Sequence, residues 1–247
     1  MEFNVGEIQF SNQDGVARLI LNNPSARNAM SISMMTEFAS IVERLEQNTP
    51  RILVMTGTGY KSFCSGGDLR DVRSTLIEKG REMSQKMNQL TARLKQLPIY
   101  IIVGIEGAAV GGGAELMTLG DWIIASQNAR IQFLQAPLGV TTGWGGGGRL
   151  LKKSPQKAIH LLLGGYFPIE DLHRWGIVDQ IVANKQVHIS CENKVQELLS
   201  IPECSMRGML ELSREPEREI EIFSSLWGGE VHRQSIAVKR THKNKDV

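Results

Sequence analysis

Two short glycine-rich turns constrain this chain more than any other feature. They are Ser65-Gly-Gly-Asp-Leu69 and Gly111-Gly-Gly-Ala-Glu115, and about 45 residues separate their equivalent glycines. Each turn follows a segment with the pattern of a strand and precedes a segment with the periodicity of a helix. The first amides of a helix have no acceptor within the helix and lie at the positive end of its dipole. Turns of this kind are therefore candidates for binding an anion.

The second turn carries a carboxyl group beside its amides. It follows an apolar run from Ile99 to Ile105, and Glu115 lies just beyond its three glycines. Fixed donors next to an acid or base are the groups needed to stabilise an enolate or a tetrahedral oxyanion. A glycine turn can equally serve only to let a helix pack closely on a strand, and this stretch alone leaves both interpretations open. The spacing is not G-x-G-x-x-G and no Lys-Ser/Thr follows, which disfavours nucleotide binding.

The composition excludes several functional classes. With 247 residues, of which 41% are hydrophobic, the chain can bury one large core. The net charge of +2 gives no general basis for binding nucleic acid or a membrane, although the tail at 239–245 is basic. Three cysteines without a C-x-x-C pair predict no metal site and a reducing, cytoplasmic location. No secretory signal and no membrane-spanning segment are expected.

The remaining pattern predicts an α/β protein. Residues 5–10 and 16–22 resemble a hairpin, 33–47 and 76–96 have the spacing of amphipathic helices, and residues 51–56 resemble a buried strand. We therefore expect a catalytic core over residues 1–185. Residues 186–247 are expected to form a C-terminal helical region for packing or oligomerisation.

The two turns occur with other motifs in an order that resembles the crotonase (enoyl-CoA hydratase/isomerase) superfamily. These motifs are Asn23-Pro-Ser-Ala-Arg-Asn-Ala-Met30, Gly120-Asp121, Gly143-Trp-Gly-Gly146 with Arg149-Leu150, and Trp175-Gly-Ile-Val-Asp179. The resemblance implies a spiral of repeated β-β-α units with C-terminal helices that build a homotrimer or a dimer of trimers. It also implies an acyl-CoA thioester as substrate, so that coenzyme A belongs to the substrate and no further cofactor is needed.

By position, the resemblance gives roles to individual residues. The amides of Gly67 and Gly112 would form an oxyanion hole around the thioester carbonyl. Ala26, Arg27, Ser65, Asp68 and Leu69 match the positions where family members hold the nucleotide and pantetheine. For Arg27, a solvated surface charge is the alternative.

A loop that follows the second turn is expected to line the acyl pocket. It places Thr142 and Trp144 beside a run of glycines. These side chains could also hold a leaving carboxylate, whereas simple packing is the more common role of a tryptophan.

The acid and base groups separate the possible reactions. Hydratases of this superfamily use two glutamates, and Glu115 matches the first of them. The segment expected to carry the second reads Leu134-Gln-Ala-Pro-Leu-Gly139 and contains no carboxylate; the aligned residue is Pro137, or Gln135 if the gap is placed differently. Neither can transfer a proton as glutamate does. Decarboxylation of a malonyl-type thioester needs the oxyanion hole and only one proton.

The local motifs, including Leu226-Trp-Gly-Gly229, resemble the ethylmalonyl-CoA decarboxylase branch, although that branch carries Lys-Glu where this chain has Ala136-Pro137. We predict that Glu115 protonates the enolate or orients a water that does so. The structural alternative is a buried glutamate that only braces the turn. The other functional readings are an enoyl-CoA hydratase or isomerase, and a non-catalytic protein that binds acyl-CoA or RNA.

Overall fold

The chain forms two compact units. The computed structural model describes residues 2–4, 7–68 and 77–243. The two units are Met1–Val195 and Gln196–Val247. Leu69, one of the expected binding residues, lies outside the described residues. The expected site residues all belong to the first unit.

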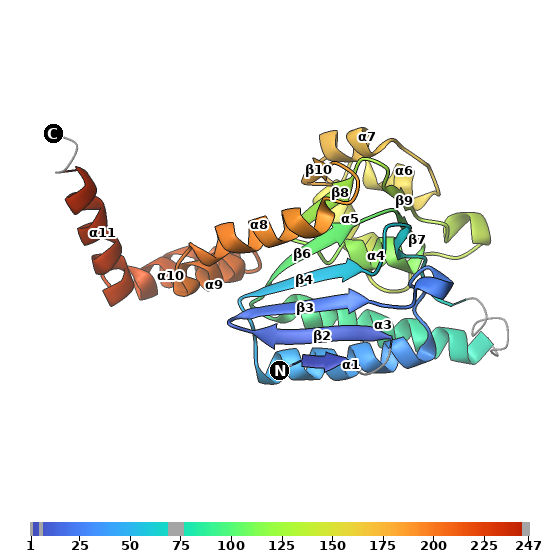
Figure 1. The fold of residues 1–247 in the computed structure, drawn as a ribbon, viewed down its shortest axis with the longest axis horizontal. Coiled ribbons are helices and arrows are strands. Elements are labelled where there is room, and N and C mark those ends of the chain that lie inside the picture. The colour runs from blue at the N-terminus through green and yellow to red at the C-terminus, as the bar shows by residue number, and fades with distance from the viewer. Residues whose placement is uncertain (1, 5–6, 69–76, 244–247) are drawn as a thin grey trace. The chain divides into compact units, whose positions relative to one another are not determined.

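A seven-stranded sheet runs through the first unit (Figure 1). Its order is β1-β2-β3-β4-β6-β8-β10, antiparallel from β1 to β3 and parallel from β3 to β10. The strands are β1 Glu2–Asn4, β2 Ile8–Gln13, β3 Val16–Leu21, β4 Ile52–Gly57, β6 Tyr100–Ile105, β8 Trp122–Ser126 and β10 Gln180–Val182. The central parallel strands are almost continuously apolar because both faces of the sheet are covered.

A second, smaller sheet contains three short parallel strands. These are β5 Ser62–Cys64, β7 Ala108–Val110 and β9 Arg130–Gln132, in the order β5-β7-β9. Each of β4, β6 and β8 in the large sheet leads directly to one of them, and a helix follows each short strand. The predicted spiral of repeated β-β-α units is therefore confirmed.

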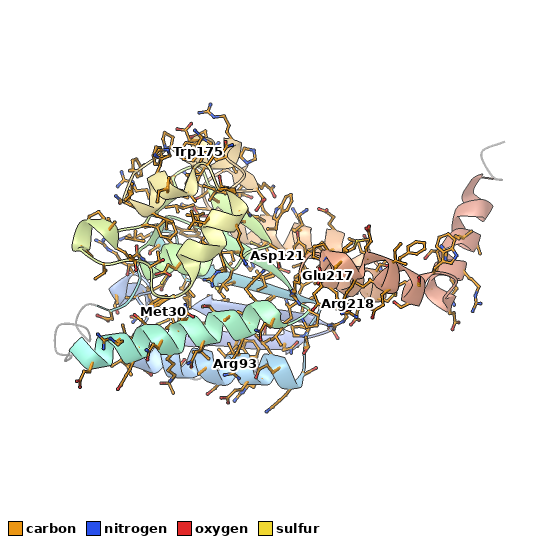
Figure 2. The ribbon with its side chains drawn as sticks, turned by 180° about the vertical axis from the view of Figure 1, so that it is seen from behind. Met30, Arg93, Asp121, Trp175, Glu217 and Arg218 are labelled. Carbon is orange, nitrogen blue, oxygen red and sulfur yellow. The ribbon has the colours of Figure 1, made fainter. Side chains whose placement is uncertain are left out.

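Helices cover the sheet and end the repeats. Helices α1 (Ile32–Gln47) and α3 (Ile77–Gln96) lie side by side along the sheet (Figures 1 and 2). Ser31 begins α1 by accepting the Met34 amide at 3.1 Å, as expected of an N-cap. The helices that complete the repeats and follow them are α4 Gly112–Met117, α5 Gly146–Lys153, α6 Ala158–Leu162 and α7 Ile169–Arg174. Short 3₁₀ turns lie at Pro24–Ala26 (η1) and Ala136–Leu138 (η2).

The second unit is helical. Helix α8 (Val187–Leu199) leads into it, followed by α9 Glu203–Leu212, the 3₁₀ turn η3 Pro216–Arg218, α10 Glu219–Leu226 and α11 Glu230–Lys243. Arg218 forms ion pairs with Glu211, Glu215 and Glu221 and so ties α9, η3 and α10 together. These pairs are partly exposed, which makes each one weak.

Most elements agree with the sequence pattern, and two differ. The expected hairpin, the helices near 33–47 and 76–96 and the strand near 51–56 are present as β2–β3, α1, α3 and β4. Strand β1 was not expected; it adds to the edge by pairing with β2. The Ser154-Pro155 pair has the sequence pattern of an N-cap followed by proline at the first helical position, but helix α6 begins only at Ala158. Ser154 instead ends α5, and its carbonyl accepts the amides of Lys157 and Ala158.

Candidate active site

The two glycine turns meet at the carboxyl ends of parallel strands. Strands β5 and β7 pair in parallel, and so do β7 and β9. Because the carboxyl ends of parallel strands lie at one edge of a sheet, the segments after Cys64, Val110 and Gln132 converge there. The amide of Gly111 donates to the carbonyl of Gln132 at 2.9 Å, which joins the second turn to β9.

The turns approach each other so closely that side chains are excluded. A Cβ on Gly66 would lie 3.1 Å from the amide nitrogen of Gly112, and a Cβ on Gly113 would lie 2.7 Å from the carbonyl carbon of Cys64. Both distances are too short for ordinary contact, so glycine is required where the backbones pack. The close-packing interpretation of the glycines is therefore correct, and it also brings Gly67 and Gly112 to the same place.

The amides of Gly67 and Gly112 are available to a ligand. Neither donates a hydrogen bond to another described residue. Gly112 is the first residue of α4, where the helix provides no acceptor. Two amides without acceptors, close together at one edge of a sheet, can hold one developing negative charge.

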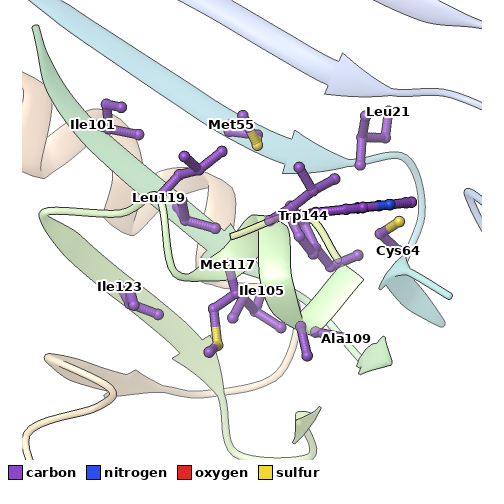
Figure 3. Packing of buried hydrophobic residues seen from close by; sticks show 14 of the residues in the cluster. Leu21, Met55, Cys64, Ile101, Ile105, Ala109, Met117, Leu119, Ile123 and Trp144 are labelled. Atoms are coloured by element: carbon purple, nitrogen blue, oxygen red, sulfur yellow. The ribbon is translucent and has the colours of Figure 1, made fainter. Parts of the chain in front are cut away.

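Trp144 packs against both glycines. The residue is 4% exposed, and its indole lies beside Cys64 in the buried cluster around α4 (Figure 3). A Cβ on Gly112 would lie 2.5 Å from Cη2 of this ring, whereas a Cβ on Gly67 would lie 3.9 Å from Cζ2. The ring is thus a wall of the site rather than a free side chain. Thr142 lies nearby and packs on Gly147: a Cβ on Gly147 would lie 3.4 Å from the Cβ of Thr142.

Glu115 accepts four hydrogen bonds. Its Oε1 receives Nε2 of Gln135 at 2.9 Å and the amide of Gly143 at 3.1 Å. Its Oε2 receives the amides of Trp144 at 2.7 Å and Gly146 at 3.0 Å. The side chain is 2% exposed. An ionised carboxylate suits four donors, since a carboxylic acid would present a hydrogen to one of them.

Arg149 completes this brace from α5. Its Nε donates to Thr118 Oγ1 at 2.9 Å, and its Nη2 donates to the carbonyls of Glu115 at 3.2 Å and Trp144 at 3.0 Å. Burial lowers the pKa of Arg149 to about 10, while the charge of Glu115 acts in the opposite direction. The guanidinium stays charged at neutral pH and holds α4 and α5 together. No role was expected for Arg149 from the sequence, although it belonged to a quoted motif.

The segment after β9 places Gln135, not Pro137, beside Glu115. Pro137 is exposed and packs instead on Gly164, where a Cβ would lie 2.9 Å from Cδ of the proline. Of the two residues that the sequence offered for the second carboxylate, the structure therefore places an amide next to Glu115. The Ala136-Pro137 departure lies on the exposed side of the turn.

The expected thioester-binding residues surround the first turn. Ala26 ends η1, and its carbonyl accepts Ser65 Oγ at 3.1 Å. The carbonyl of Arg27 accepts the Ser65 amide at 3.2 Å, and Arg27 is exposed to solvent. Asp68 is buried, and its amide donates to the Met30 carbonyl at 3.0 Å. The expected binding residues thus lie in neighbouring segments, around Ala26-Arg27 and Ser65 to Asp68. The hydroxyl of Ser65, however, donates its hydrogen bond to the backbone carbonyl of Ala26.

Asn28 holds this segment in place, a role that was not expected. It is 1% exposed, and its Nδ2 donates to the carbonyls of Thr58 at 3.1 Å and Ser62 at 2.7 Å. Its left-handed backbone (φ 58°) follows that of Arg27 (φ 56°). The available sequence signal was the asparagine itself, because asparagine tolerates left-handed backbone and favours turns.

The thiol of Cys64 lies in the last residue of β5, next to the first glycine turn. Cys64 is fully buried, and burial raises the pKa of its thiol to about 12, so it is not a nucleophile near neutral pH.

Within the described ranges, no three His, Cys, Asp or Glu side chains are grouped as they would be around a metal ion. None of the helices in that part of the chain is long and apolar enough to cross a membrane.

Comparison with known proteins gives this geometry a context. The sequence profile of the enoyl-CoA hydratase/isomerase family matches residues 11–221. Ethylmalonyl-CoA decarboxylase of Danio rerio is 31% identical, over 96% of this chain and 84% of its own length. The protein of that name from Xenopus tropicalis is 30% identical, over 98% of this chain and 86% of its own length. A crystal structure of enoyl-CoA hydratase from Bacillus anthracis has the same fold, with a TM-score of 0.86, 22% identity and 97% of each chain covered.

Proposed function

The chain belongs to the enoyl-CoA hydratase/isomerase family, and on this premise we propose that it is a carbon–carbon lyase that decarboxylates a malonyl-type thioester of coenzyme A. Ethylmalonyl-CoA is the first expected substrate, because similar proteins carry the name ethylmalonyl-CoA decarboxylase. Methylmalonyl-CoA is the second, because it is a malonyl-type thioester of the same kind. The observation that carries the proposal is a pair of backbone amides, those of Gly67 and Gly112, that have no acceptor among the described residues and lie near a carboxylate whose side-chain neighbour is Gln135.

The reaction follows from this arrangement. The thioester carbonyl oxygen accepts the amides of Gly67 and Gly112, and the bond between the α-carbon and the carboxylate breaks. The electron pair moves into an enolate whose negative oxygen the two donors stabilise, and carbon dioxide leaves. One such donor typically contributes about 3 kcal/mol to the transition state. No base is needed to start the reaction, which suits a site where Glu115 is fully engaged as an acceptor.

Hydration requires a second acid or base beside Glu115, and among the described residues Gln135 lies at that place. A hydratase must activate a water and deliver a proton, and Gln135 can do neither as a carboxylate would. Incubating the purified chain with ethylmalonyl-, methylmalonyl- and crotonyl-CoA, and scoring each by mass spectrometry, tests the assignment. We expect loss of carbon dioxide from the first two. Faster gain of water by crotonyl-CoA would assign a hydratase, and failure to bind any acyl-CoA would favour the non-catalytic alternative.

The proposed reaction needs no resident cofactor, because the thioester itself delocalises the electron pair. We expect the decarboxylase rate to be unchanged after dialysis against EDTA, whereas a metal-dependent reaction would lose it. The three free cysteines, two of them buried, fit the proposed reducing and cytoplasmic location.

We also propose that the second unit mediates self-association into a trimer or a dimer of trimers. Its helices enclose a mainly apolar groove of about 1010 Å³ between α9, α10 and α11. Met209, Ile220, Phe223 and Trp227 line this groove, although each remains more than half exposed. Large exposed side chains gathered in one groove are typical of a surface that another chain covers.

Phe223→Glu is therefore expected to shift the protein from trimer or hexamer to monomer at micromolar concentration. A charge in an apolar interface costs several kcal/mol unless it is paired. Sedimentation velocity measures the change. Ser224→Glu is the matched control, because Ser224 is exposed on the same helix but does not line the groove. A wild-type protein that sediments as a monomer would contradict the proposal.

A further inference from the structure

Gln135 is held in one orientation by Glu115. Its Nε2 lies 2.9 Å from Glu115 Oε1, which also accepts the Gly143 amide. With the side chain turned over, two acceptor oxygens would face each other, so the hydrogen bonds fix which end of the amide meets Glu115. Oε1 of Gln135 consequently faces away from the carboxylate.

That outward oxygen is buried and has no partner among the described residues. Buried carbonyl oxygens in proteins nearly always accept a hydrogen bond, from protein or from an ordered water. Gln135 Oε1 is therefore an acceptor of fixed orientation, on a side chain that contacts Glu115 directly. Glu115 itself lies in the first turn of α4, as does Gly112. An acceptor of this kind can hold a small molecule that has an O–H group, and water is the smallest such molecule.

Glu115 has no proton to give in this arrangement. Each of its two carboxylate oxygens already accepts two hydrogen bonds. The proton that ends the proposed reaction must therefore come from another group.

We infer that Gln135 Oε1 binds the water that protonates the enolate, with Glu115 holding the amide in the required orientation. Gln135 is then a positioning residue, and the inference rests on the proposed decarboxylase function. After carbon dioxide leaves, one O–H bond of the water breaks and its proton forms a C–H bond at the α-carbon. The electron pair of the enolate enters that new bond. The remaining hydroxide adds to carbon dioxide and gives bicarbonate, so that substrate and water yield the shortened thioester and bicarbonate.

The configuration of the product tests this role. In D₂O, a held water delivers deuterium to one face of the enolate, and we expect wild-type enzyme to convert ethylmalonyl-CoA to butyryl-CoA deuterated at C2 in a single configuration. Gln135→Met keeps the length of the side chain but removes the oxygen. We expect it to release carbon dioxide with kcat lowered about tenfold, KM within twofold, and both configurations at C2. NMR of a chiral ester of the product measures their ratio.

Gln132→Met is the matched control, because Gln132 lies three residues earlier and donates instead to the Gly164 carbonyl. It should keep a single configuration. If Gln135→Met does not fold, Gln135→Ala carries the same expectation of mixed configuration, with thermal melting used to show that the variant is folded. A single configuration from the Gln135 variants would overturn the inference and leave a nearby group such as Asp68 as the donor. A wild-type enzyme that releases no carbon dioxide would instead overturn the proposed function.

Discussion

Replacing Gly112 with alanine is expected to lower kcat/KM for ethylmalonyl-CoA at least about 100-fold, the loss that typically follows removal of one oxyanion donor. A methyl group at this position would lie 2.5 Å from Cη2 of Trp144 and 2.8 Å from its Cε3. The ring is buried and cannot turn aside, so the first turn of α4 must move. That movement takes the Gly112 amide away from the thioester oxygen. Overpacking should also destabilise the fold by about 1–3 kcal/mol.

Carbon dioxide release and urea denaturation measure the two effects. Gly148→Ala is the control: it makes the same chemical change in α5, where a Cβ would meet nothing within 4 Å. This variant should keep full activity and gain up to about 1 kcal/mol from helix propensity. Wild-type activity in Gly112→Ala would mean that the Gly112 amide does not hold the oxyanion.

Replacing Glu115 with glutamine is expected to cost more stability than any other change of a single atom in this site. Glutamine offers one accepting oxygen, so its amide nitrogen would face either Gln135 and Gly143 or Trp144 and Gly146. Two donors would then lose their acceptor, at about 1–3 kcal/mol for each one that is buried. We expect the free energy of unfolding to fall by roughly 2–6 kcal/mol. We also expect kcat to fall at least about tenfold, because Trp144 is no longer held in place.

The pH dependence distinguishes bracing from proton donation. If Glu115 only accepts hydrogen bonds, the folded variant should keep the wild-type shape of its kcat profile at a lower level. If Glu115 supplies the proton, a limb of that profile should disappear while stability changes little. Glu37→Gln is the control, because Glu37 also accepts two backbone amides, those of Glu7 and Ile8, but on α1. It should lose stability and keep its activity.

The structure thus changes the expected role of Glu115 more than that of any other residue. From the sequence, the residue had three possible roles: acid, holder of a water, or brace. In the structure, four hydrogen-bond donors converge on the Glu115 carboxylate, so it holds the surrounding loop in place and also orients the side chain of Gln135. The neighbour, Gln135, was only one of two residues that could align with the second carboxylate. The choice needed the path of the chain after β9, which turns Pro137 toward Gly164.

The resemblance of its motifs to a family implied the repeated β-β-α architecture and the proposed oxyanion role of Gly67 and Gly112. The sequence by itself determined most of the strands and helices, the two glycine turns and the absence of a carboxylate from residues 134–139. These are local properties: apolar runs give strands, and glycines mark the places where a Cβ cannot fit. Only the tertiary structure decided which groups touch Glu115, how Arg149 ties α4 to α5, and that Trp144 lies over Gly112 rather than free in the site. Those contacts join residues about 20 to 34 positions apart. Hydrogen-bond partners at such separations depend on how the strands align, which no local pattern specifies.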